Sequence, residues 1–146
     1  MTRQAIHRFG TFEDIINVIV QLIESDTKIL KEKIQSPKVL SLEADFSPQA
    51  VSIMLCLIDL NCIIVPLTES VAHKKDEFKR IAEVEVSIIV KDENFSVDFE
   101  NTTATHEILT KLKNENHPGL ILFSSESTGE NKAAVHDFLY LLRACW

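Results

Sequence analysis

The spacing of apolar residues along this chain changes repeatedly between a helical period and a strand period. Residues 15–34 carry isoleucine and leucine at helical spacing, beginning with Ile15, Ile16 and Ile19. Thr11 stands before two acidic residues, as is typical of a helix N-cap, and the Ser36-Pro37 pair ends the helix. The pattern therefore predicts a long amphipathic helix with one face in the core.

Later segments predict strands that alternate with further helices. We expect strands at 38–43, 62–66, 85–90, 94–99 and 120–123, and helices at 47–60, 74–83, 105–114 and from about Val135 to Arg143. The helix at 105–114 should turn Ile108, Leu109 and Leu112 inward. Such alternation predicts an α/β fold with a mainly parallel sheet and helices on both faces.

Composition narrows the class of protein. The 146 residues suit one domain, and 15 basic against 22 acidic residues give a net charge of −7, which disfavours nucleic acid as a partner. No apolar run approaches the roughly 20 residues that cross a membrane, and the N-terminus does not resemble a secretory signal.

The titratable side chains outside the loop described next show no pattern of a metal site. Cys56, Cys62 and Cys145 form no CxxC pair, so we interpret them as small hydrophobic residues of a cytoplasmic protein. The histidines have no metal-ligand spacing. Four carboxylates are expected at solvated helix ends and in loops, namely Glu24, Asp26, Glu43 and Asp45.

The segment 120–136, LILFSSESTGENKAAVH, has the chemistry of a phosphate-binding loop. Hydroxyls and a lysine can meet anionic oxygens, Gly129 permits a positive φ, and a helix from about Val135 would direct its positive end to the site. The candidate residues are Ser124, Ser125, Ser127, Thr128, Gly129 and Lys132. The alternative is a polar loop without a ligand, and the GxxxxGK[ST] pattern of ordinary nucleotidases is not matched.

This loop resembles the Ser/Thr/Gly-rich signature of the AMP-forming adenylating superfamily, which includes acyl-CoA synthetases, luciferase-type enzymes and adenylation domains. The signature runs roughly [YF]-[ST]-S-G-[ST]-T-G-x-P-K-[GA], and here Phe123, Ala133 and His136 fit it together with the six candidates above. Upstream, Phe46-Ser47-Pro48-Gln49 and Val65-Pro66-Leu67 are similar to early segments of that superfamily. The resemblance runs collinearly over about residues 12–143.

The resemblance implies a role for the chain. It would be the N-terminal part of an ATP-dependent ligase that makes an acyl-adenylate from a small carboxylic acid, with ATP and Mg²⁺ held by the loop. His136 falls at a position near the acyl pocket. The catalytic residues of such enzymes lie in later segments that cannot be placed here, so residues 1–146 are expected to form a single partial domain that is inactive alone.

Two residues depart from the signature. Glu126 stands where the superfamily has glycine, and Asn131 stands where it has proline. A glutamate near phosphate oxygens costs on the order of 1–4 kcal/mol, so we expect weaker nucleotide binding than in typical members. Glu126 and the end of the chain within a predicted helix favour the alternative of a non-catalytic binding or assembly module, or a degenerate remnant. Self-association through a truncated face is also expected.

Overall fold

A computed structural model describes residues 10–125 and 129–144. Over these residues the helices and strands follow in the order α2 (Phe12–Lys33), β1 (Val39–Glu43), α3 (Pro48–Asp59), β2 (Ile63–Leu67), the 3₁₀ helix η1 (Glu69–Lys74), α4 (Lys75–Ile81), β3 (Val86–Lys91), β4 (Asn94–Phe99), α5 (Glu107–Asn114), β5 (Gly119–Ser125), β6 (Asn131–Asp137) and α6 (Phe138–Ala144).

The strands within the described residues form one sheet in the order β4-β3-β1-β2-β5-β6. The neighbours β3-β1, β1-β2 and β2-β5 are parallel, whereas β4 and β6 pair antiparallel at the two edges. The prediction of a mainly parallel α/β sheet is confirmed for the four central strands. The antiparallel edges arise because β3-β4 and β5-β6 are joined by short hairpin connections, which cannot link parallel strands.

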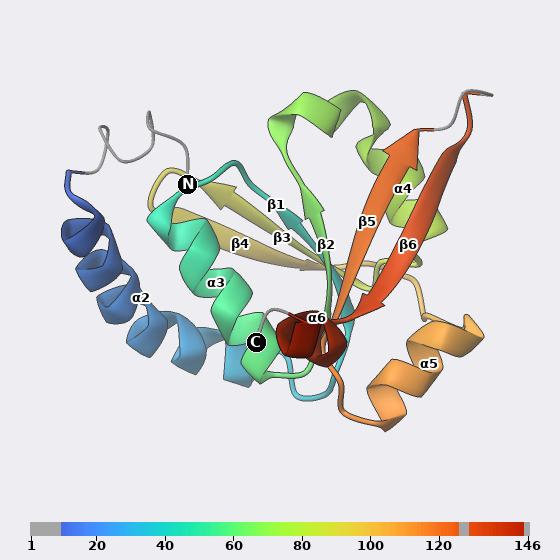
Figure 1. Ribbon diagram of the computed structural model, residues 1–146, viewed down its shortest axis with the longest axis horizontal. Coiled ribbons are helices and arrows are strands. Elements are labelled where there is room, and N and C mark those ends of the chain that lie inside the picture. Colours follow the sequence, from blue (N-terminus) through green and yellow to red (C-terminus); the bar gives the residue numbers. More distant parts are fainter. Residues whose placement is uncertain (1–9, 126–128, 145–146) are drawn as a thin grey trace.

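Helices cover both faces of this sheet (Figure 1). On one face α2 and α3 contribute Leu30, Ile53 and Leu57 to a core with Leu40 and Ile64 of the central strands. The opposite face is covered by α4 and α5, which contribute Phe78, Leu109 and Leu112 to a second core. Ile108 was predicted to point inward, but it is 49% exposed, because α5 presents only the stripe that contains Leu109 and Leu112.

The polar contact between α2 and α3 was not predicted. Asp26 is buried, and its Oδ2 accepts hydrogen bonds from Gln49 Nε2 at 2.6 Å and Ser52 Oγ at 2.7 Å. The expectation that Asp26 is solvated is therefore wrong, because the carboxylate lies on the face of α2 that packs against α3. Burial raises the pKa of Asp26, and the two hydrogen bonds offset this only in part.

The segment after β5 also differs from its prediction. Residues 131–137 were expected to lead into a helix that begins near Val135, but they form β6, which pairs with β5 from Ser125↔Asn131 to Gly119↔Asp137. The ladder with β5 overrides the local helix preference of Ala133 and Ala134. The helix begins only at Phe138, where Asp137 Oδ1 accepts a hydrogen bond from the Leu139 N–H.

Replacing Asp26 with asparagine is expected to change the pH dependence of stability. Because the pKa of Asp26 is raised in the folded state, the ionised carboxylate lowers the free energy of unfolding at neutral pH. This penalty disappears as the pH falls through the raised pKa, and it is absent below the ordinary value of 3.8. The free energy of unfolding of the native chain, measured by urea unfolding, should therefore rise relative to that of Asp26→Asn as the pH falls from 7 to 4. A constant difference across this range would contradict the prediction.

Two glycines of the β5-β6 hairpin should respond differently to alanine. Gly129 has a φ of +84° and open space where a Cβ would lie, so Gly129→Ala should cost about 1 kcal/mol from backbone strain alone. A Cβ on Gly119 would lie 3.1 Å from Leu112 Cδ1 and 3.2 Å from Ile63, so Gly119→Ala should cost about 1–3 kcal/mol by overpacking. Chemical denaturation measures both, and a Gly129→Ala chain as stable as the native one would rule out the positive φ.

Candidate functional site

The candidate phosphate-binding residues lie at the free end of the β5-β6 hairpin. Strand β5 pairs with β2 only at Gly119 and Leu120, whereas it pairs with β6 along its whole length. The hairpin therefore extends beyond the carboxyl end of β2, and its last rung, Ser125↔Asn131, lies far from α6 (Figure 1). The predicted helix N-terminus cannot contribute to this site, because α6 begins at the opposite end of the hairpin.

Ser124 and Lys132 are brought together in one rung of the ladder. They are directly opposite each other in the antiparallel pair, and both side chains are exposed. Residues opposite one another in such a pair have Cβ atoms about 4.5–5.5 Å apart. Ile121 and Phe123 face the core beneath α4, so by strand alternation Ser124 and Lys132 project from the other face. A hydroxyl and an ammonium group thus lie side by side at the hairpin end.

The structure describes the remaining candidate residues only in part. The backbone of Ser125 pairs with Asn131 in the last rung of the ladder. Gly129 has the positive φ that its role predicts. Ser127 and Thr128, together with Glu126, lie outside the described residues. His136 pairs with Leu120, four residues along β6 from Lys132, which corresponds to about 13 Å of strand. The structure therefore does not bring His136 to the hairpin end.

The helix α4 supports the hairpin from the sheet face opposite Ser124 and Lys132. The rings of Phe78 on α4 and Phe123 on β5 stack with centroids 4.0 Å apart and an angle of 8° between their planes. At the start of α4, Lys74 Nζ donates a hydrogen bond to Asn131 Oδ1 at 3.4 Å. The amide at position 131, where the superfamily signature has proline, therefore serves as an acceptor.

A buried carboxylate on β1 fixes the same helix. The side chain of Glu43 is only 8% exposed, and it forms ion pairs with Lys75 at 3.2 Å and Lys79 at 3.4 Å. The expectation that Glu43 is solvated is wrong, because α4 covers the end of β1. A lysine pair at i and i+4 on a predicted helix was a signal for such a carboxylate.

Lys79 also forms an ion pair with a second carboxylate, that of Glu100, which Ser87 of β3 contacts as well. Lys79 Nζ also contacts Glu100 Oε1 at 3.0 Å, and Ser87 Oγ donates to that oxygen at 2.6 Å. Burial lowers the pKa of Lys79, but the hydrogen bond from Lys79 to Glu100 and the nearby carboxylates outweigh it, so the pKa lies above its usual value. The hydrogen bonds from Ser87 and Lys79 hold the pKa of Glu100 below its usual value. Lys79 and Glu100 therefore both stay charged at neutral pH.

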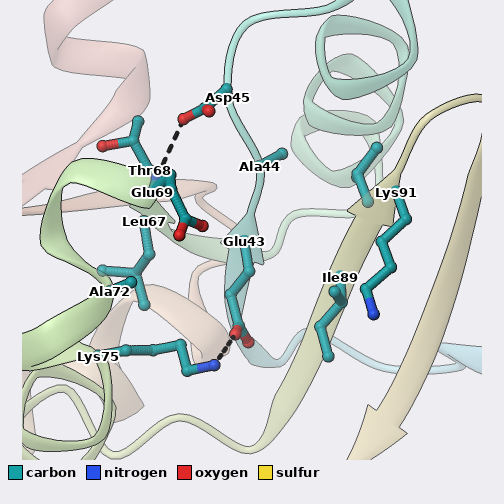
Figure 2. A pocket seen from close by; sticks show the side chains of 11 residues that line it. Glu43, Ala44, Asp45, Leu67, Thr68, Glu69, Ala72, Lys75, Ile89 and Lys91 are labelled. Atoms are coloured by element: carbon teal, nitrogen blue, oxygen red, sulfur yellow. Dashed lines mark hydrogen bonds and ion pairs between the residues drawn. The ribbon is translucent and has the colours of Figure 1, made fainter.

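A cavity of about 290 Å³ opens at the carboxyl ends of β1, β2 and β3 (Figure 2). Asp45 Oδ1 accepts a hydrogen bond from the Glu69 N–H at 3.0 Å on one wall, and Lys91 lies on another. The chain leaves β1 toward α3 and leaves β2 toward α4, on opposite faces of the sheet. In open α/β sheets ligands bind at such a switch point, at the carboxyl ends of the strands. The cavity and the hairpin end therefore share the edge of the sheet where binding is expected.

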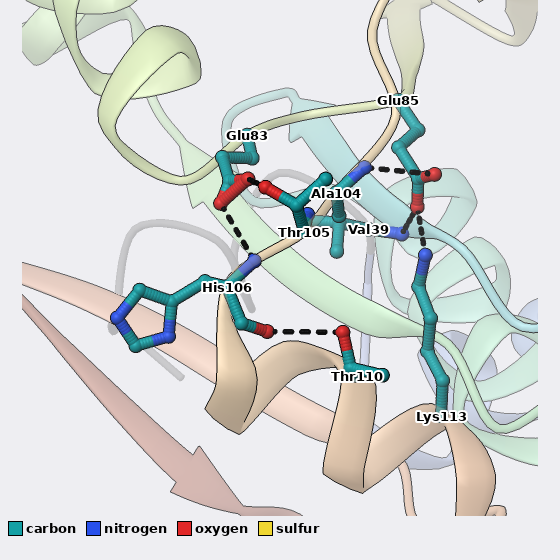
Figure 3. A network of polar contacts seen from close by, with 8 residues as sticks. All are labelled: Val39, Glu83, Glu85, Ala104, Thr105, His106, Thr110 and Lys113. Atoms are coloured by element: carbon teal, nitrogen blue, oxygen red, sulfur yellow. Dashed lines mark hydrogen bonds and ion pairs between the residues drawn. The ribbon is translucent and has the colours of Figure 1, made fainter.

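A second polar network holds the segment that leads into α5 and β5 (Figure 3). Glu85 is buried and accepts hydrogen bonds from the Val39 N–H at 3.0 Å, the Ala104 N–H at 3.2 Å and Lys113. Burial raises the pKa of Glu85, but the bonds from Lys113 and the two backbone groups outweigh it, so the pKa lies below its usual value. This carboxylate joins β1, β3 and α5, and it contributes to the fold, not to the candidate site.

Other candidate chemistry is limited in the part of the chain that the structure describes. Cys56 and Cys62 are free and buried, as predicted, and burial raises the pKa of Cys62 to about 11. No group of three or more histidine, cysteine, aspartate or glutamate side chains among these residues could hold a metal ion. None of the described helices combines the length and apolar character that crossing a membrane would require.

Comparison with known proteins identifies the fold. No protein-family model matches the sequence, and none of the curated proteins matches it. Structures of the Klebsiella oxytoca NpsA N-terminal subdomain do match, in complex with 3-hydroxyanthranilyl-AMSN at a TM-score of 0.56 and 16% identity, and in complex with 3-hydroxybenzoyl-AMSN at 0.52 and 16%. A third structure, in space group P21, matches at a TM-score of 0.52 and 15% identity.

Each of these comparisons covers 90% of this chain. The chain spans only 38% or 39% of the NpsA subdomain. The strands and helices, with the sheet they form, thus agree with part of the NpsA subdomain. The chain has the fold of that part of the NpsA N-terminal subdomain.

Proposed function

We propose that this chain is the phosphate-binding part of an ATP-dependent ligase that activates a carboxylic acid as an acyl-adenylate. The fold supports this proposal, since two of the matching NpsA structures hold acyl-AMP analogues. The observation that carries it is the rung of Ser124 and Lys132 at the end of a hairpin that extends beyond the carboxyl ends of the sheet. The position and the chemistry both suit an anionic ligand.

Each candidate residue has a role in the proposal. Lys132 neutralises charge on the β- and γ-phosphates, and the hydroxyls of Ser124 and Ser125 donate hydrogen bonds to phosphate oxygens. Gly129 lets the backbone turn near the phosphates, since its φ is +84°. Ser127 and Thr128 enter from the sequence resemblance alone.

The ligands follow from the same proposal. ATP would bind with Mg²⁺, which compensates the charge of the triphosphate. His136 would lie by the acyl group of the ligand, because its place along β6, about 13 Å from Lys132, separates it from the terminal phosphates. The buried free thiols of Cys56 and Cys62 suit a reducing cytoplasm.

Charge at the hairpin end should control nucleotide affinity in both directions. Lys132→Gln removes a charge-assisted contact worth about 1.5–3 kcal/mol, so the Kd for Mg-ATP should rise about 10- to 100-fold. Glu126→Gly removes a like charge, so the Kd should fall by about tenfold. Isothermal titration calorimetry on the 146-residue chain measures both variants.

The control for this experiment is Lys28→Gln, which removes an exposed charge from α2, far from the β5-β6 hairpin (Figure 1). Its Kd should equal that of the native chain. Equal affinities of the native, Lys132→Gln and Glu126→Gly chains would contradict a phosphate site at the hairpin.

The 146 residues alone should not catalyse adenylation. Reaction at the α-phosphate requires the carboxylate to be held in line with the nucleotide, and the hairpin would hold only the outgoing phosphates. Carboxylate-dependent exchange of pyrophosphate into ATP should therefore equal the background without protein. Exchange above that background, abolished by Lys132→Gln, would show that this part is sufficient for the reaction.

A second candidate function is a non-catalytic binding or assembly module with the same fold. Glu126 and Asn131 favour it, because both replace residues that shape the phosphate loop in the superfamily signature. Under this alternative neither the native chain nor Glu126→Gly binds Mg-ATP, whereas the ligase proposal requires that at least Glu126→Gly binds it. The calorimetric series above therefore separates the two functions.

A further inference from the structure

We propose that Lys74 is a second phosphate-binding cation of the hairpin, supplied from the connection between β2 and α4. Lys74 is the last residue of η1, and its Nζ lies 3.4 Å from Asn131 Oδ1 in the last rung of the β5-β6 ladder. This inference rests on the proposed function, and it adds a residue that lies outside the Ser/Thr/Gly-rich segment.

The structure holds Lys74 at this place from two sides. Four residues further along, Phe78 stacks on Phe123 of β5, which fixes α4 against the hairpin near its free end. The next residue, Lys75, forms an ion pair with Glu43 of β1, and Lys79 forms a second one with the same carboxylate. Since α4 is anchored to both β1 and β5, the backbone at Lys74 cannot move away from the hairpin without breaking these contacts.

The partners of Lys74 differ in charge from those of the neighbouring lysines, Lys75 and Lys79. Lys75 and Lys79 are each paired with a buried or half-buried carboxylate. Among the described residues, the contact found for Lys74 is with a neutral amide oxygen, and no carboxylate lies within ion-pair distance of it. Its positive charge is therefore not neutralised by the described part of the chain and can attract an anion.

Lys74 and Lys132 approach the hairpin end from opposite faces. Asn131 and Lys132 are consecutive on β6, so their side chains project to opposite sides of the ladder. Lys74 reaches Asn131 on the side of α4, whereas Lys132 lies on the side of Ser124. Two cations at the last two rungs of one hairpin suit a ligand with several adjacent negative charges, such as a triphosphate.

Asn131 makes this arrangement particular to the present sequence. A proline, which the superfamily signature has at this position, lacks the side-chain oxygen that accepts the hydrogen bond from Lys74. Asn131, which departs from the signature, thus forms its side-chain hydrogen bond with Lys74.

Three variants of the 146-residue chain test the inference by calorimetry with Mg-ATP, inorganic tripolyphosphate and AMP. Lys74→Gln can still donate to Asn131 but carries no charge, and its Kd for Mg-ATP and tripolyphosphate should rise about tenfold. Lys74→Arg keeps the charge, and its Kd should stay within about threefold of the native value. Affinity for AMP, which lacks the outer phosphates, should not change in either variant.

The matched control, and the third variant, is Arg80→Gln, which removes a charge from the same helix and should leave every Kd unchanged. Thermal unfolding without ligand checks that Lys74→Gln is as stable as the native chain. If Lys74→Gln binds as tightly as the native chain while Lys132→Gln binds weakly, the role of Lys74 is structural and this inference is wrong. If neither the native chain nor Glu126→Gly binds ATP or tripolyphosphate, this inference and the proposed function both fail.

Discussion

The arrangement at the carboxyl edge of the sheet depends on one buried carboxylate, that of Glu43. A charge removed from water must be paired, and here Lys75 and Lys79 provide the pairing. The two lysines bind α4 to the end of β1, and the Phe78-Phe123 stack then binds the same helix to β5. The position of Lys74 beside Asn131 follows from this anchoring of α4, whereas strand pairing with β2 directs the hairpin. An electrostatic requirement inside the fold therefore contributes to the geometry of the candidate site.

Two further buried carboxylates organise the rest of the molecule in a similar way. Glu85 accepts hydrogen bonds from two backbone N–H groups and from Lys113, and so connects β1, β3 and α5. Asp26 accepts hydrogen bonds from Gln49 and Ser52, and so connects α2 to α3. The difference lies in their charge balance. Glu85 has a cationic partner and a lowered pKa, whereas Asp26 has only neutral donors and a raised one.

The fold and the candidate site provide different kinds of information about function. The fold matches the NpsA N-terminal subdomain at 15–16% identity, which is a likeness of architecture. The site is specific to this chain, because Glu126 adds a negative charge where the signature has glycine and Asn131 adds an acceptor that contacts Lys74. If the chain binds a nucleotide, it does so with a charge distribution unlike that of the signature. In our proposal, Lys74 and Lys132, on opposite faces of the hairpin, supply the positive charge for an anionic ligand.

The sequence by itself determined the order and type of nearly all the elements, because apolar periodicity and capping residues are local signals. It also indicated Ser124, Gly129 and Lys132, since hydroxyls, glycine and lysine in one segment have a recognisable chemistry. It did not determine that residues 131–137 form a strand, since a ladder with β5 outweighed the helix preference of the alanines. Nor could it show that Asp26 and Glu43 are buried or that Lys74 meets Asn131. Those contacts join residues 23 to 57 positions apart, so only the packing of helices on the sheet decides them.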